Sequence, residues 1–173
     1  IFDSRCDIKD SGYGIDSYTE GHIENSIFID VDTDLASEKR PGTGRHPLPD
    51  VSSFSEKLSH WGMSNNKQVV VYDDAGGAFA GRLWWMLKWL GHEAVAVLDG
   101  GLNSWVKDGN KLVTTPTIFE KSYFEANVQE NMIATVKDVE EAQFKMNTIL
   151  LDARSKERYE GINDPVDPIA GHI

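Results

Sequence analysis

The loop from Asp73 to Ala78 has the composition of a site that binds a negatively charged group. It follows the apolar run Val69 to Val71 and leads into another apolar segment, so it should join a buried strand to a helix. A glycine turn at the start of a helix collects backbone N–H groups without partners in the helix, and these favour an anion. The loop contains no Cys, Ser, Lys or His, however, and Asp73 is itself an anion. The sequence therefore predicts an anion cradle without a nucleophile.

Cys6 is the only thiol of the chain and the other candidate for nucleophilic chemistry. It lies three residues after Asp3, and no glycine turn or helix start follows it that could lower the pKa of the thiol. We therefore expect an incidental cysteine.

Three histidines, His22, His46 and His172, could be metal ligands or bases. Each lies in a short turn with glycine or proline, at spacings unlike those of paired zinc ligands, so we expect structural hydrogen bonds and no metal site. Aspartates also close the other apolar strands, where Asp is a common turn and cap residue. We expect that role for Asp3, Asp30, Asp99 and Asp152.

The elements that must position the loop alternate between strand and helix. Three valines without polar alternation indicate a strand buried on both faces, which is typical of a parallel sheet covered by helices. The sequence thus predicts the α/β class. The other expected strands are Ile1–Asp3, Ile27–Ile29 and Ala94–Leu98, and the expected helices are one within 6–26 and those at 54–61, 78–90 and 102–106.

Composition limits the partners. The net charge of −11 argues against nucleic acid or an anionic membrane as the main partner, because both need clustered Lys and Arg. A single cysteine rules out a disulfide within the chain, so we expect a cytoplasmic protein. Nothing in the composition calls for a cofactor.

An internal repeat organises the C-terminal part of the chain. Leu150–Arg154 repeats Ile1–Arg5, and Gly171–Ile173 repeats Gly21–Ile23. The spacing is 18 residues from Asp3 to Gly21 (21 − 3) and 19 from Asp152 to Gly171 (171 − 152). A helix from Val136 to Phe144, capped by Thr135, and a strand from Thr148 should precede the second copy.

The repeat predicts a fragment of a longer tandem protein. Residues 1–115 would form the first domain without its first strand and helix, and residues 116–131 a connector lying against a surface. Residues 132–173 would be the truncated start of a second domain.

These motifs together resemble the two-domain rhodanese family of thiosulfate and 3-mercaptopyruvate sulfurtransferases. The resemblance covers nearly the whole chain. The matching blocks are Asp3–Arg5, Gly21–Ile23, Gly44–Pro49, Val69–Asp73, Arg82–Trp85, Gly91–His92, Val97–Leu102 with Trp105, Asp152–Arg154 and Gly171–Ile173.

The resemblance implies two rhodanese-like domains, each with a central parallel sheet between helices. It also implies a cysteine in the second domain that carries sulfur as a persulfide from a small-molecule donor to a thiophilic acceptor. Asp73 would occupy the counterpart of that cysteine position in the first domain, and the cysteine itself would lie beyond Ile173. The 173 residues alone should therefore be inactive.

Arg158 matches the family's substrate-binding arginine. Mercaptopyruvate enzymes of the family add a second arginine nine positions later, where this chain has Asp167. The resemblance thus favours thiosulfate as the donor. A non-catalytic regulatory module and an anion-binding module that uses the Asp73 loop remain open as alternatives.

Overall fold

The computed structural model describes residues 1–162, 164 and 169–173. They form two compact units, Ile1–Glu130 and Asn131–Ile173, which are described separately. The first is called the first unit and the other the second unit.

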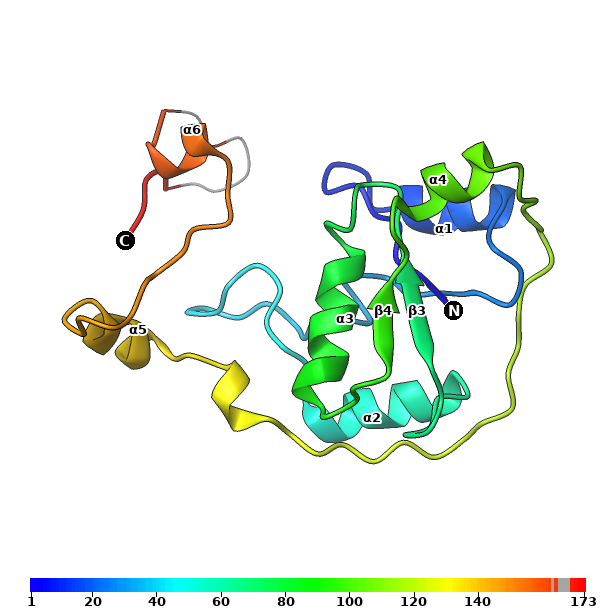
Figure 1. The fold of residues 1–173 in the computed structure, drawn as a ribbon, viewed down its shortest axis with the longest axis horizontal. Helices are drawn as coiled ribbons and strands as arrows, with labels where there is room; N and C mark the ends of the chain where they lie inside the picture. The colour runs from blue at the N-terminus through cyan, green and yellow to red at the C-terminus, as the bar shows by residue number, and fades with distance from the viewer. Residues whose placement is uncertain (163, 165–168) are drawn as a thin grey trace. The chain divides into compact units, whose positions relative to one another are not determined.

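The first unit contains a parallel sheet of four strands in the order β2-β1-β3-β4 (Figure 1). The predicted α/β class with a central parallel sheet is confirmed, and all four strands lie where the apolar runs predicted them. Their bounds are β1 Phe2–Asp3, β2 Ile27–Phe28, β3 Val69–Tyr72 and β4 Val95–Val97.

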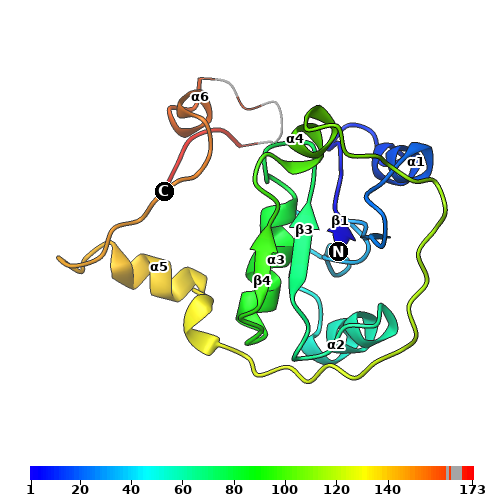
Figure 2. The ribbon, with the colours of Figure 1, turned by 45° about the vertical axis from the view of Figure 1, so that its right-hand side comes forward.

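Four helices accompany the sheet. Helix α3 packs along β3 and β4, and α4 lies with α1 near the carboxyl ends of the strands (Figures 1 and 2). Helix α2 lies toward the opposite end of the sheet. The bounds are α1 Tyr13–Glu20, α2 Val51–His60, α3 Ala80–Trp89 and α4 Gly101–Lys107.

An aspartate caps the start of helix α2. The Asp50 side chain accepts a hydrogen bond from Ser53 N, so Asp50 is the N-cap. Gly62 ends the helix with φ +74, a left-handed conformation that glycine adopts without a steric penalty.

The core lies between the sheet and the apolar faces of the helices. In α3 the apolar face is buried, since Leu83, Met86 and Leu87 are fully enclosed. The connector covers part of the unit as predicted: Phe124 is 3% exposed, and Asn127 N donates to Leu90 O at 2.9 Å. No helix in the described part of the chain is long and apolar enough to cross a membrane.

The short 3-10 helix η1, Glu130–Met132, begins at the last residue of the first unit, and the second unit contains α5 Val136–Ala142 and α6 Lys156–Tyr159. Thr135 caps α5 in a reciprocal capping box with Asp138, as predicted. The prediction of a strand from Thr148 was wrong. A strand needs backbone partners, and none lies beside 148–152 among the described residues; Ile149 is 82% and Leu151 88% exposed.

Candidate functional site

The carboxylate of Asp73 is held by four backbone N–H groups at the carboxyl end of β3. Oδ1 accepts from Ala75 N at 3.0 Å and Gly77 N at 2.8 Å, and Oδ2 accepts from Phe79 N and Ala80 N, both at 2.9 Å. Asp73 is 1% exposed. The loop therefore forms an anion cradle, as its sequence predicted, and its occupant is the chain's own carboxylate.

Two close contacts keep the cradle against α4. Leu102 N donates to Asp73 O at 2.9 Å, and a Cβ on Gly101 would approach Asp73 O to 2.4 Å. Asn103 Nδ2 donates to Asp74 O at 3.1 Å, while the Tyr13 hydroxyl of α1 donates to the Asp74 carboxylate. Helices on both sides thus fix the loop.

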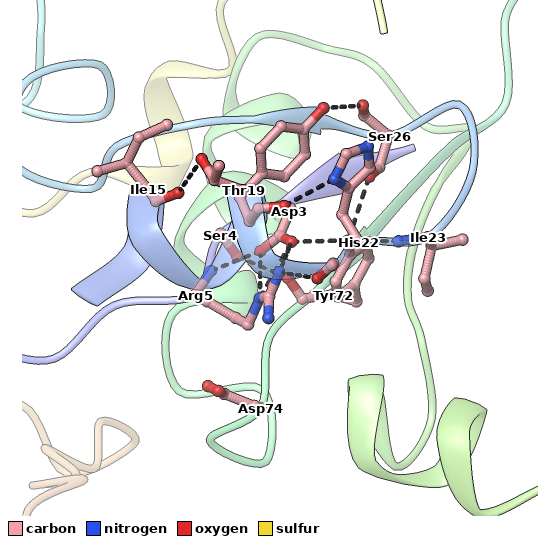
Figure 3. Close-up of polar contacts among 12 residues, drawn as sticks. Asp3, Ser4, Arg5, Ile15, Thr19, His22, Ile23, Ser26, Tyr72 and Asp74 are labelled. Carbon is pink, nitrogen blue, oxygen red and sulfur yellow. Dashed lines mark hydrogen bonds and ion pairs between the residues drawn. The ribbon is translucent and has the colours of Figure 1, made fainter. Parts of the chain in front are cut away.

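A buried polar network lies beneath this loop (Figure 3). Arg5 Nη2 contacts Asp3 Oδ2 at 2.7 Å and Gly21 O at 2.8 Å, and the Tyr72 hydroxyl donates to Asp3 Oδ2 at 2.7 Å. That hydroxyl also accepts from Ile23 N at 3.1 Å. Burial and the Asp3 carboxylate raise the pKa of Tyr72, so its phenol stays neutral. Asp3 is the last residue of β1, and sequence reasoning, which expected only a turn or cap role, missed its buried contacts with Arg5 and Tyr72.

The three histidines form structural hydrogen bonds, as predicted, although most of their partners lie outside their own turns. His22 is fully buried, with Nδ1 2.8 Å from Tyr18 O and Nε2 3.1 Å from Thr115 O. His46 Nε2 lies 2.6 Å from Asp32 Oδ1, and His172 Nδ1 lies 2.6 Å from the carbonyl of Tyr159.

Cys6 is half-buried and poorly suited to act as a nucleophile. Burial and the nearby carboxylates, Asp32 first among them, raise the pKa of its thiol to about 11. The thiolate, which is the reactive form, is therefore scarce at neutral pH.

The second unit reproduces the Asp–Arg–Gly contact of the first. Arg154 Nη2 lies 2.6 Å from Asp152 Oδ2 and 2.6 Å from Gly171 O. In both copies the histidine ring also stacks on a tyrosine, Tyr159 at 3.8 Å and Tyr18 at 3.7 Å between ring centroids, although the two tyrosines lie at different positions of the repeat. The two sequence copies thus share local geometry.

Arg158, the predicted substrate-binding residue, pairs with an acidic neighbour. Its Nε donates to Asp164 Oδ1 at 3.1 Å, and the Asp164 side chain is 1% exposed. Asp164 had no place in the sequence-based site. Asp167, on which the expected donor preference depends, lies outside the described residues.

The family profile described as "Rhodanese-like domain" matches residues 1–108. The chain belongs to the rhodanese family. This agrees with the resemblance found in its motifs and with the parallel sheet between helices.

Two named sulfurtransferases match 100% and 90% of the chain. It is 39% identical over 175 residues to a Pseudomonas aeruginosa protein named "Probable 3-mercaptopyruvate sulfurtransferase", covering 100% of this chain and 62% of that protein. It is 32% identical over 163 residues to the thiosulfate sulfurtransferase of Rattus norvegicus, covering 90% of this chain and 53% of the rat protein. The chain therefore spans about half to three fifths of the length of these relatives.

Solved structures agree. The 3-mercaptopyruvate sulfurtransferase of Leishmania major matches with a TM-score of 0.85 and 30% identity, over 99% of this chain and 48% of that one. SseA from Escherichia coli matches with a TM-score of 0.82 and 29% identity, over 99% and 64% of the respective chains. The relatives of this rhodanese chain are sulfurtransferases.

Proposed function

We propose that the intact protein is a rhodanese-type sulfurtransferase that moves sulfane sulfur from thiosulfate to cyanide or a thiol. The observation that carries the proposal is the match of the whole chain to sulfurtransferases at up to 39% identity. In the proposed reaction a cysteine thiolate attacks the outer sulfur of thiosulfate, forming a persulfide and releasing sulfite. Cyanide then takes the terminal sulfur, leaving as thiocyanate, and the thiolate is regenerated.

The first domain has no catalytic role in this proposal. The four N–H groups around Asp73 would suit a thiolate or persulfide equally well, but a carboxylate cannot carry sulfane sulfur. Asp73 is thus the counterpart of the sulfur-carrying cysteine, and Cys6 is no substitute because the pKa of its thiol is about 11. The cysteine is proposed to lie after Ile173 in the parent protein.

A tandem arrangement supports this assignment. The Asp152–Arg154–Gly171 contacts repeat those of Asp3, Arg5 and Gly21. We assign residues 1–115 to the first domain, 116–131 to the connector and 132–173 to the start of the second.

The proposed donor is thiosulfate. Arg158 supplies a guanidinium, which suits an anionic donor through charge-assisted hydrogen bonds. The carboxylate of Asp167, where mercaptopyruvate enzymes have arginine, would repel the carboxylate of mercaptopyruvate. A kcat/KM for mercaptopyruvate above that for thiosulfate would contradict this preference.

The test is thiocyanate release from thiosulfate and cyanide by the purified parent protein. We expect turnover by the parent and none above background by the 173-residue chain. Turnover by the short chain that disappears with Cys6→Ser would overturn the assignment of the sulfur carrier.

A non-catalytic anion-binding module is the alternative, and the cradle argues against it. Asp73 already accepts all four N–H bonds and is 1% exposed, so an external anion would have to displace a buried carboxylate. Calorimetric titration of the 173-residue chain with thiosulfate should show no binding. Binding that is unaffected by Arg158→Ala and abolished by changes in the loop would favour the alternative.

A further inference from the structure

The buried carboxylate of Asp164 in the second unit forms ion pairs with two arginines. Asp164 Oδ1 accepts from Arg158 Nε at 3.1 Å, and Oδ2 lies 3.5 Å from Arg154 Nη1. The Asp164 side chain is 1% exposed, whereas those of Arg158 and Arg154 are 23% and 26% exposed. A carboxylate that is removed from water in this way is costly unless it is paired with positive charge. Asp164 is therefore bound firmly between the guanidinium groups.

Comparison of the two repeat copies shows which contacts of Arg154 also occur in the first unit. In the first unit Arg5 pairs with Asp3 and donates to Gly21 O, and within the described residues it forms no ion pair with a second carboxylate. Arg154 makes both equivalent contacts, to Asp152 and Gly171. Asp74 acts on Arg5 only electrostatically, so the contacts to the aspartate and the glycine carbonyl form in the first unit without a second ion pair like that of Asp164.

The arginine that Asp164 orients is also specific to the second copy. Arg158 lies four residues after Arg154, and the same position after Arg5 holds Lys9. Lysine ends in a single ammonium group at Nζ and has no planar fork, so it offers no Nε through which a partner could orient further donors. The first copy thus forms the shared contact of aspartate, arginine and glycine without an equivalent of the Arg158–Asp164 pair. The pair is therefore not needed for that structural contact.

We infer that Asp164 is a positioning residue for Arg158, holding its guanidinium in one orientation before the anionic sulfur donor binds. The inference rests on the proposed function, in which Arg158 binds that donor. An exposed arginine would lose rotamer freedom on binding, and a contact made in advance removes part of that cost. The hydrogen bond at Nε sets the plane in which the other guanidinium donors lie.

Steady-state kinetics of the full-length parent test this role. In a ping-pong reaction kcat/KM for thiosulfate reports only the first half-reaction, and kcat/KM for cyanide reports only the second. We expect Asp164→Asn to lower kcat/KM for thiosulfate by about tenfold, the loss of one charge-assisted contact, and to leave kcat/KM for cyanide unchanged. Asp164→Glu, which keeps the charge, should recover most of the loss.

Two further variants complete the design. In an Arg158→Ala background Asp164→Asn should lower kcat/KM for thiosulfate by less than about a further twofold. The effects of two residues are not additive when one acts through the other. Glu160→Gln removes one carboxylate beside α6, where its partner is the exposed Lys156, and serves as the charge-matched control with both kinetic constants unchanged.

The outcomes separate the two proposals. Equal losses in both kcat/KM values for Asp164→Asn would mean a smaller folded fraction and overturn the positioning role. No effect of Asp164→Asn, while Arg158→Ala still weakens thiosulfate use, would also overturn it and leave the proposed function intact. A parent protein that releases no thiocyanate would remove the proposed function and this inference with it.

Discussion

Replacing Asp73 by asparagine should destabilise the first unit strongly, although the two side chains have nearly the same shape. The amide keeps one acceptor oxygen, and its NH₂ group would face two of the four N–H donors that now bind the carboxylate at 2.8–3.0 Å. Each charge-assisted bond contributes about 1.5–3 kcal/mol. Partial hydration of the freed donors offsets some of the loss of two such bonds, so we expect the free energy of unfolding to fall by about 3 kcal/mol.

Urea unfolding followed by tryptophan fluorescence measures this change. All five tryptophans lie at positions 61–105, so the signal reports the first unit alone. With a denaturant slope of about 2 kcal/mol/M, the midpoint should fall by about 1.5 M. Asp74→Asn is the matched control. The Asp74 carboxylate accepts one hydrogen bond, from the Tyr13 hydroxyl, so its loss should lower the free energy of unfolding by only about 0.5–1.5 kcal/mol. If the free energy of unfolding of Asp73→Asn lies within about 0.5 kcal/mol of the wild-type value, the hydrogen bonds to Asp73 do not stabilise the fold as argued.

Three other expectations follow from buried or shifted groups. Tyr72→Phe should cost about 3 kcal/mol of unfolding free energy in the same assay, because it leaves Ile23 N–H and a carboxylate oxygen of Asp3 without this partner; a change below about 1 kcal/mol would contradict the network. Cys6, whose thiol pKa rises from 9.0 to about 11, should react with iodoacetamide at pH 8 about 100-fold more slowly in the native chain than in urea, and equal rates would show that the thiol is unperturbed. The hydrogen bonds from Arg154 lower the pKa of Asp152 to about 2, so their stabilising effect is complete above the ordinary carboxyl pKa and is lost as pH falls from about 4 to 2; carboxyl chemical shifts that titrate near pH 4 would refute this.

Local pattern in the sequence was enough to predict the strand, loop and helix around Asp73. The four donors to its carboxylate come from residues two to seven positions later, so they are close to Asp73 along the chain. The repeat of Ile1–Arg5 in Leu150–Arg154 was also evident from the sequence, and the Asp–Arg contact that the structure shows in both copies joins residues two positions apart.

Only the tertiary structure decided the contacts that join distant segments. The hydroxyl of Tyr72 reaches Asp3 across 69 positions because β1 and β3 are neighbours in the sheet, and an apolar run does not specify which strand it pairs with. The same limit explains the error at 148–152, where a strand-like sequence has no neighbour to bond with among the described residues. Asp164 was missed because it belongs to no periodic pattern, and its contacts with two arginines are visible only in the structure. Periodicity encodes which side chains avoid water, whereas pairing depends on which segments meet in space.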